Sequence, residues 1–263
     1  MTWTTQPRSD LHGLAAIVAG AGPQVLLFHG VGLRAEAWGA QIDALSPVAR
    51  VVAVDMPGHG HSPLRADLQM LADYTDAIAA LLNQPTVVVG HSMGAMIALD
   101  LAARHPQHVI AVAALNGIYQ RSPSASAAVQ ARAQALDGVT VQDPEPTLTR
   151  WFGSDAAPAR TACATWLRAV DPAGYRAAYT VFAHTDGPSP TALENLHCPA
   201  LFMTGAEEPN STPAMSRAMA HRAPQGRAEV VAGAAHMMPM THPGAVNAAL
   251  STLLHDTCPA ERT

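Results

Sequence analysis

The chain has 263 residues, of which 49% are hydrophobic and 13% are charged, and its formal net charge is -5. These values are typical of one compact globular domain with a sizeable core, and they exclude an intrinsically disordered chain. The acidic balance argues against a nucleic-acid or membrane partner. The sequence contains no lysine, which excludes Schiff-base chemistry.

The sequence also bears on compartment and redox chemistry. No apolar run reaches membrane-spanning length, and the N-terminal residues lack the basic start and apolar core of a secretory signal. We therefore expect a cytoplasmic protein. The three cysteines, Cys163, Cys198 and Cys258, are widely spaced and odd in number, which fits neither a disulfide framework nor a zinc knuckle.

Short apolar runs alternate with helical patterns along the chain, as in βα units around a mostly parallel central sheet. The runs are apolar throughout, as strands covered by helices on both faces should be. We expect strands at 25–28, 50–55, 86–90, 109–115, 200–205 and 228–233, and helices near 35–45, 71–83, 93–104, 213–222 and 243–254.

One interval, 118–196, contains no strand pattern, only helix-like segments separated by proline-rich turns. We interpret it as a helical cap inserted into an α/β core formed by 1–117 and 197–263. Seven of the twelve Phe, Trp and Tyr residues fall in this interval, which favours a cap that covers a pocket. The alternative is that these side chains only pack the cap onto the sheet. The seven are Tyr119, Trp151, Phe152, Trp166, Tyr175, Tyr179 and Phe182.

Ser92 stands between two glycines, in "GHSMG" at 90–94, where a strand pattern ends and a helix pattern begins. An abrupt strand-to-helix turn needs small flanking residues, which Gly90 and Gly94 provide. Such a turn lifts the serine hydroxyl to a helix N-terminus, where N–H groups and the helix dipole favour negative charge. This position suits a nucleophile, although serine is also an ordinary helix N-cap.

A serine nucleophile needs a histidine base and a carboxylate that orients the histidine. His236 follows the last predicted strand and Glu208 follows the strand before it. Both loops lie at the carboxyl ends of parallel strands, where open α/β sheets build their sites. Glu207 is the neighbouring alternative, although a solvated loop charge is the simpler interpretation of this residue.

With these residues, the chain resembles the α/β-hydrolase family over nearly its whole length. The order of nucleophile, acid and histidine is the family's order. A glutamate at 208 departs from the family's usual aspartate. The segments that carry the resemblance are "FHGVG" at 28–32, "DMPGHGHS" at 55–62, "GHSMG" at 90–94, "GAEEPNSTP" at 205–213 and "GAAHMMPM" at 233–240.

The resemblance implies an eight-stranded α/β-hydrolase fold without a cofactor. It implies an oxyanion hole made by the backbone N–H groups of Val31 and Met93. It also implies hydrolysis of a small ester or lactone through an acyl-enzyme, as in small carboxylesterases and enol-lactone hydrolases. Because position 92 is serine and not aspartate, the chain does not resemble haloalkane dehalogenases or epoxide hydrolases.

The expected pocket combines cap aromatics with side chains near the loops of the site. Arg34 is a candidate for contact with a substrate carboxylate, with an exposed loop arginine as the alternative. The thirteen histidines show no metal-binding spacing, so we expect no metal. The expected pocket residues are Trp38, Trp151, Trp166, Tyr175, Tyr179 and Met237.

Two other functions stay open. Carbon–carbon bond hydrolases of ring-cleavage products share the triad and the cap, and a ligand-binding protein can keep the fold without turnover. The expected partner is a small-molecule ester or lactone, and the sequence leaves a homodimer open.

Overall fold

The computed structural model describes residues 3, 5–153 and 157–258. Within them, one sheet of eight strands has the order β1-β2-β4-β3-β5-β6-β7-β8. The pairs from β4 to β8 are parallel, whereas β1 and β2 are antiparallel to their neighbours. The expected mostly parallel sheet is thus confirmed. The strands are β1 (Ser9–Leu11), β2 (Leu14–Ala19), β3 (Gln24–Phe28), β4 (Arg50–Val54), β5 (Thr86–His91), β6 (Val109–Leu115), β7 (Ala200–Gly205) and β8 (Gly226–Val231).

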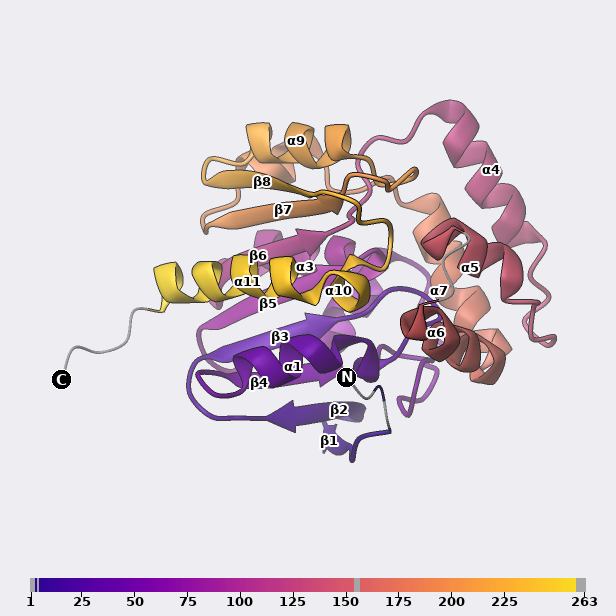
Figure 1. Ribbon diagram of the computed structural model, residues 1–263, viewed down its shortest axis with the longest axis horizontal. Helices are drawn as coiled ribbons and strands as arrows, with labels where there is room; N and C mark the ends of the chain where they lie inside the picture. The colour runs from indigo at the N-terminus through magenta and orange to yellow at the C-terminus, as the bar shows by residue number, and fades with distance from the viewer. Residues whose placement is uncertain (1–2, 4, 154–156, 259–263) are drawn as a thin grey trace.

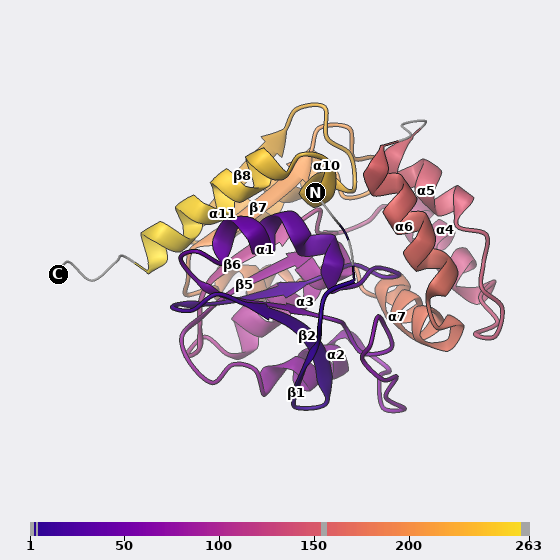
Figure 2. The ribbon, with the colours of Figure 1, turned by 60° about the horizontal axis from the view of Figure 1, so that its bottom comes forward.

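Helices cover both faces of the sheet. Figure 2 shows α1 and α11 over one face and α2 and α3 over the other. The helices are η1 (Ala35–Trp38), α1 (Gly39–Leu45), α2 (Leu71–Ala79), α3 (Met93–Arg104), α4 (Pro123–Gln134), α5 (Glu145–Phe152), α6 (Pro158–Ala169), α7 (Pro172–His184), α8 (Pro190–Glu194), α9 (Pro213–Arg222), α10 (Met238–Thr241) and α11 (Pro243–Thr257).

The core lies in two layers because successive side chains of a strand point to opposite faces. Leu26 and Phe28 of β3 pack with Ile97 of α3 on one face. Leu27 of the same strand packs with Leu250 of α11 on the other face. A strand buried on both sides therefore appears in the sequence as a continuous apolar run.

Helices α4 to α8 follow β6 and precede β7 along the chain, in the interval predicted as a cap. Figure 1 shows α4 to α7 gathered beyond the end of the sheet to which the parallel strands point. Helix α8 instead packs against α3 and α9 of the core. We call α4 to α7 the helical insertion. The division into a core and a cap at 118 and 196 stays a prediction.

The insertion meets the core through two glycines, Gly58 after β4 and Gly174 in α7. A Cβ atom on Gly174 would collide with the carbonyl group of Gly58. Gly58 also has a φ of 75°, a conformation that side-chain-bearing residues rarely adopt. The two backbones therefore touch directly at this point.

Candidate active site

Ser92 occupies the turn between β5 and α3 with φ 57° and ψ -118°, a strained conformation for a residue other than glycine. A Cβ atom on Gly90 would collide with the carbonyl of Gly94, and one on Gly94 would collide with the carbonyl of Phe28. The glycines predicted from the sequence are therefore required sterically. Together they allow the sharp turn that leaves Ser92 at the N-terminus of α3.

His236 lies in the loop after β8 and bonds to Glu208 in the loop after β7. The distance from His236 Nδ1 to Glu208 Oε2 is 2.7 Å. Glu208 is only 3% exposed, whereas the neighbouring Glu207 is exposed. Of the two candidate acids, the structure thus pairs Glu208 with the histidine.

The environment of Glu208 favours its ionised form. Burial alone would raise the pKa of this carboxyl group. The charge and hydrogen bond of His236 and the N–H groups of Asn210 and Ser211 outweigh burial, and the pKa falls to about 2. The two N–H groups donate to Oε1 at 2.8 and 3.2 Å. Glu208 is therefore a carboxylate at neutral pH, able to accept the hydrogen bond from His236 Nδ1.

Two side chains hold the backbone carbonyl of His236. Asn116 Nδ2 donates to this oxygen at 2.6 Å, and His91 Nε2 donates to it at 2.7 Å. The amide oxygen of Asn116 in turn accepts hydrogen bonds from Thr204 Oγ1 and the N–H of Gly205, at 2.9 and 3.2 Å. Asn116 thereby links the ends of β6 and β7 to the histidine loop.

His91 can hold this carbonyl only as a donor. Burial, followed by the nearby His236, lowers the pKa of His91 to about 3, so its ring is neutral and carries one proton. The bond to the carbonyl requires that this proton sits on Nε2. We did not identify His91 or Asn116 as supports of the site from the sequence. Their only signal was their position at the ends of strands.

Ser92 and His236 line one cavity of about 370 Å³ beneath the helical insertion, which we call the Ser92 cavity. Among the described residues, Ser92 Oγ makes no hydrogen bond to His236. Such bonds are often long without substrate and shorten when substrate binds. The other lining residues are Val31, Asn116, Ile118, Arg121, Ser122, Ala125, Ala128, Val129, Arg132, Thr147, Arg150, Trp151, Tyr175, Tyr179, Phe182, Pro209, Asn210, Ser211, Thr212 and Met215.

The two expected oxyanion donors come from the loop after β3 and from the start of α3. Val31 follows β3 and lines the cavity. Met93 is the first residue of α3, and the N–H groups of a helix's first turn have no partner within the helix. The side chain of Met93 is buried and is not among the residues that line the cavity, so the contribution expected of Met93 is that of its backbone N–H.

Three of the six expected pocket residues line the Ser92 cavity, namely Trp151, Tyr175 and Tyr179. The other three do not line this cavity. Trp38 is 1% exposed and packs on the face of the sheet that α11 covers. Trp166 and Met237 belong to an apolar cluster between the insertion and the core, in which large side chains are buried against one another.

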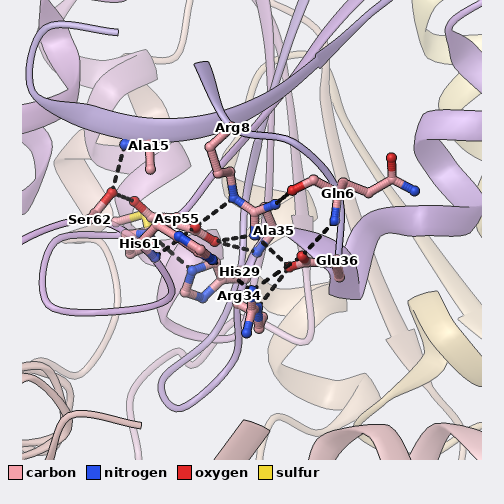
Figure 3. Close-up of polar contacts among 11 residues, drawn as sticks. Gln6, Arg8, Ala15, His29, Arg34, Ala35, Glu36, Asp55, His61 and Ser62 are labelled. Atoms are coloured by element: carbon pink, nitrogen blue, oxygen red, sulfur yellow. Dashed lines mark hydrogen bonds and ion pairs between the residues drawn. The ribbon is translucent and has the colours of Figure 1, made fainter. Parts of the chain in front are cut away.

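A buried ion cluster holds the loop that follows β3 (Figure 3). Arg8 Nε lies 2.7 Å from Asp55 Oδ2, and Arg8 NH2 lies 2.5 Å from Glu36 Oε2. Asp55 Oδ1 accepts the N–H of Ala35 at 2.8 Å. Arg34 bonds to Glu36 at 2.8 Å. Arg34 thus pairs with Glu36 in this loop and does not line the Ser92 cavity, where contact with a substrate carboxylate was expected.

Asp55 and Glu36 are ionised in this cluster. Burial alone would raise the pKa of Asp55, but the hydrogen bonds from Arg8 and from the N–H of Ala35 lower it below its ordinary value. The pKa of Glu36 is lowered in the same way by Arg8 and Arg34. The charges thus stabilise the loop that carries Val31.

In the described ranges, no group of three or more His, Cys, Asp or Glu side chains is arranged to hold a metal ion. In the same ranges, no helix is long and apolar enough to cross a membrane.

Comparison with known proteins agrees with the observed fold. A protein-family model, described as the alpha/beta hydrolase family, matches residues 25–249 of the sequence. The chain belongs to this family. Among solved structures, this alpha/beta hydrolase resembles a thermophilic esterase from Thermogutta terrifontis, with a TM-score of 0.84 and 24% identity over 96% of this chain and 99% of that chain. This likeness shows the fold.

Two curated relatives are closer in sequence. This alpha/beta hydrolase is 39% identical over 244 residues to the (E)-2-((N-methylformamido)methylene)succinate hydrolase of Acinetobacter baylyi, over 90% of this chain and 92% of that protein. It is 30% identical over 239 residues to the pimeloyl-acyl-carrier-protein methyl ester esterase of Aromatoleum aromaticum, over 84% and 94% of the two chains. The first relative is named as a hydrolase of a substituted succinate and the second as a methyl ester esterase.

Proposed function

We propose that this alpha/beta hydrolase transfers an acyl group from a small substrate to Ser92 and then to water. The observation that carries the proposal is that His236 shares a cavity with Ser92 while its Nδ1 bonds to the carboxylate of Glu208. Because Nδ1–H donates to Glu208, Nε2 is the nitrogen left to take a proton. Ser92 attacks, His236 Nε2 accepts its proton, and Glu208 fixes the tautomer.

The remaining steps of the reaction use the same groups. The protonated His236 gives its proton to the leaving group, and the acyl-enzyme forms on Ser92 Oγ. His236 then activates a water molecule that releases the acid product. The N–H groups of Val31 and Met93 stabilise the oxyanion in both halves, each contributing about 2.7 to 4 kcal/mol.

A small ester or lactone is the first candidate substrate. The methyl ester named for the Aromatoleum relative supports ester cleavage. An N-acyl group is the second candidate, because the 39% identical relative is named for hydrolysis of a formamido-methylene compound. In such a compound the nitrogen is conjugated to a carboxyl-substituted alkene, which makes it a better leaving group than an ordinary amide nitrogen. The same attack by Ser92 serves both.

Labelling with a fluorophosphonate tests the nucleophile directly. We expect one adduct on Ser92, located by mass spectrometry, and none on boiled protein or on Ser92→Ala. A folded protein that stays unlabelled and hydrolyses no substrate would instead support a ligand-binding member of the fold.

A substrate panel tests the reaction class. We expect turnover of p-nitrophenyl acetate, of simple lactones or of an N-formyl enamide. Turnover of a vinylogous diketone acid, with none of p-nitrophenyl acetate, would instead support carbon–carbon bond hydrolysis.

A further inference from the structure

The lining of the Ser92 cavity is strongly cationic, although the chain has a net charge of -5. Three arginines line it, Arg121, Arg132 and Arg150. Among the described residues that line the cavity, none is Asp or Glu. Cavities lined by charges of one sign concentrate ligands of the opposite sign. The lining therefore favours an anionic ligand.

Arg121 is already neutralised by the protein. Its NH1 bonds to Asp186 Oδ1 at 2.7 Å and to the carbonyl of Thr185 at 2.8 Å. Its guanidinium also lies 4.5 Å from the ring centre of Phe182. Burial, only partly offset by Asp186, lowers the pKa of Arg121 from its ordinary value. Arg121 thus joins the start of the insertion to the end of α7.

Arg132 and Arg150 have no carboxylate partner within the described part of the chain. Arg132 Nε donates to Tyr179 Oη at 3.0 Å. Arg150 NH2 donates to Thr147 Oγ1 at 2.8 Å. Each of these bonds uses one N–H of five and leaves the positive charge uncompensated. The two hydroxyls hold the guanidinium groups without neutralising them.

The two arginines come from different helices, Arg132 from α4 and Arg150 from α5. Two planar guanidinium groups on separate helices suit two carboxylates of one molecule, because each fork matches one carboxylate.

We propose that the Ser92 cavity binds a dicarboxylate of succinate type, with Arg132 and Arg150 each holding one carboxylate and the reactive acyl group lying against Ser92. The proposal rests on the proposed function for the position of the acyl group. The charges and hydrogen bonds that carry it are independent of turnover. The succinate in the name of the Acinetobacter relative has the same chemistry.

Binding of succinate to the Ser92→Ala protein, measured by calorimetry, tests the proposal without turnover. We expect Arg132→Gln and Arg150→Gln, each added to Ser92→Ala, to weaken succinate binding about 10- to 100-fold, as for the loss of a hydrogen bond to a charged group. Dimethyl succinate, which has the same four-carbon chain but no charge, should bind much more weakly than succinate.

Arg168→Gln is the matched control, because Arg168 is an exposed arginine of α6 outside the cavity lining. It makes the same change in net charge and should leave succinate binding unchanged. An equal loss in Arg168→Gln, equal binding of succinate and its dimethyl ester, or tighter binding of inorganic phosphate than succinate would each overturn the proposal. Thermal unfolding of every variant identifies losses caused by misfolding.

A second measurement separates this proposal from the proposed function. In active protein, succinate should inhibit p-nitrophenyl acetate hydrolysis competitively, and Arg132→Lys should retain more inhibition than Arg132→Gln. If no substrate is hydrolysed and Ser92 stays unlabelled, the proposed function fails while the calorimetric result still decides the ligand. If hydrolysis occurs but succinate neither binds nor inhibits, only the dicarboxylate proposal fails.

Discussion

The indole ring of Trp151 lies nearly parallel to the imidazole ring of His236, with 5.6 Å between ring centres and 22° between ring planes. Trp151 belongs to α5 of the insertion, whereas His236 belongs to a loop of the core. The insertion therefore contacts the proposed general base and does more than cover the cavity. The orientation of the imidazole depends on both parts of the chain.

Replacement of Trp151 by leucine should lower kcat/KM about 3- to 10-fold. An aromatic pair contributes about 0.5 to 1.5 kcal/mol beyond its buried area, and leucine cannot replace the stacked ring. Trp151→Phe keeps an aromatic face and should retain most of the activity. Steady-state kinetics on one ester, with thermal unfolding as the folding control, checks this. Equal activities of the Leu and Phe variants would show that the stacking is without effect.

The strain at Ser92 should be measurable as stability. Ser92→Ala and Ser92→Gly both remove the nucleophile, and both should lower turnover by orders of magnitude. Only glycine relieves the positive φ, so Ser92→Gly should be more stable than Ser92→Ala by about 1 kcal/mol. Urea unfolding of the two variants measures the difference. A more stable alanine variant would mean that the turn holds no strain.

Glu208→Gln should lower kcat much more than Glu207→Gln, because only Glu208 bonds to His236. The glutamine can still occupy the site but cannot stabilise a charged imidazole. Glu207→Gln is the matched control, since it makes the same chemical change at the neighbouring exposed position. Rates of acyl-enzyme formation compare the two. A larger effect at Glu207 would contradict the assignment of the acid.

Glu208 should also make stability depend on pH. Its pKa falls from 4.5 to about 2 on folding. A depressed carboxyl pKa stabilises the fold above the unfolded pKa, and this stabilisation disappears as pH falls through the folded pKa. The free energy of unfolding of the wild type should therefore approach that of Glu208→Gln between about pH 4.5 and pH 2. A constant difference across this range would exclude such a coupling.

Asp55→Asn should destabilise the protein by about 3 to 5 kcal/mol, because it removes one partner from a buried ion cluster. It should also lower kcat, since Asp55 fixes the N–H of Ala35 in the loop that carries Val31. Asp67→Asn is the control, because Asp67 pairs with Arg65 on the surface and its loss should change little. Urea unfolding and ester hydrolysis compare the two variants. Equal effects would show that burial of the Asp55 cluster contributes nothing.

The sequence predicted what depends on local backbone geometry. Gly90 and Gly94 are sterically required around Ser92, so the turn could be identified without coordinates. The loops of Glu208 and His236 follow strands, and parallel strands bring such loops to one edge. The first two strands of the sheet were not among the predicted runs, because β1 has only three residues and β2 (LAAIVA), although apolar, is rich in alanine and only partly buried.

Residues whose role depends on helix orientation could not be predicted. Trp38 is close in sequence to the loop of Val31, yet its side chain packs on the face of the sheet that α11 covers. Met237 is next to His236 in sequence but points into an apolar cluster. Arg132 and Arg150 resemble ordinary surface charges, and only the arrangement of α4 and α5 brings them to the cavity.

The direct contact of Gly58 with Gly174 has a consequence for how the specificity of this fold can change. Where side chains separate two elements, substitutions can slide one element over the other by exchanging rotamers. Here the backbones of Gly58 and Gly174 already touch, so the position of α7 on the core cannot be adjusted by a change of side chain. New specificities would therefore arise from substitutions on α4 and α5, which also line the Ser92 cavity, while the position of α7 on the core stays the same.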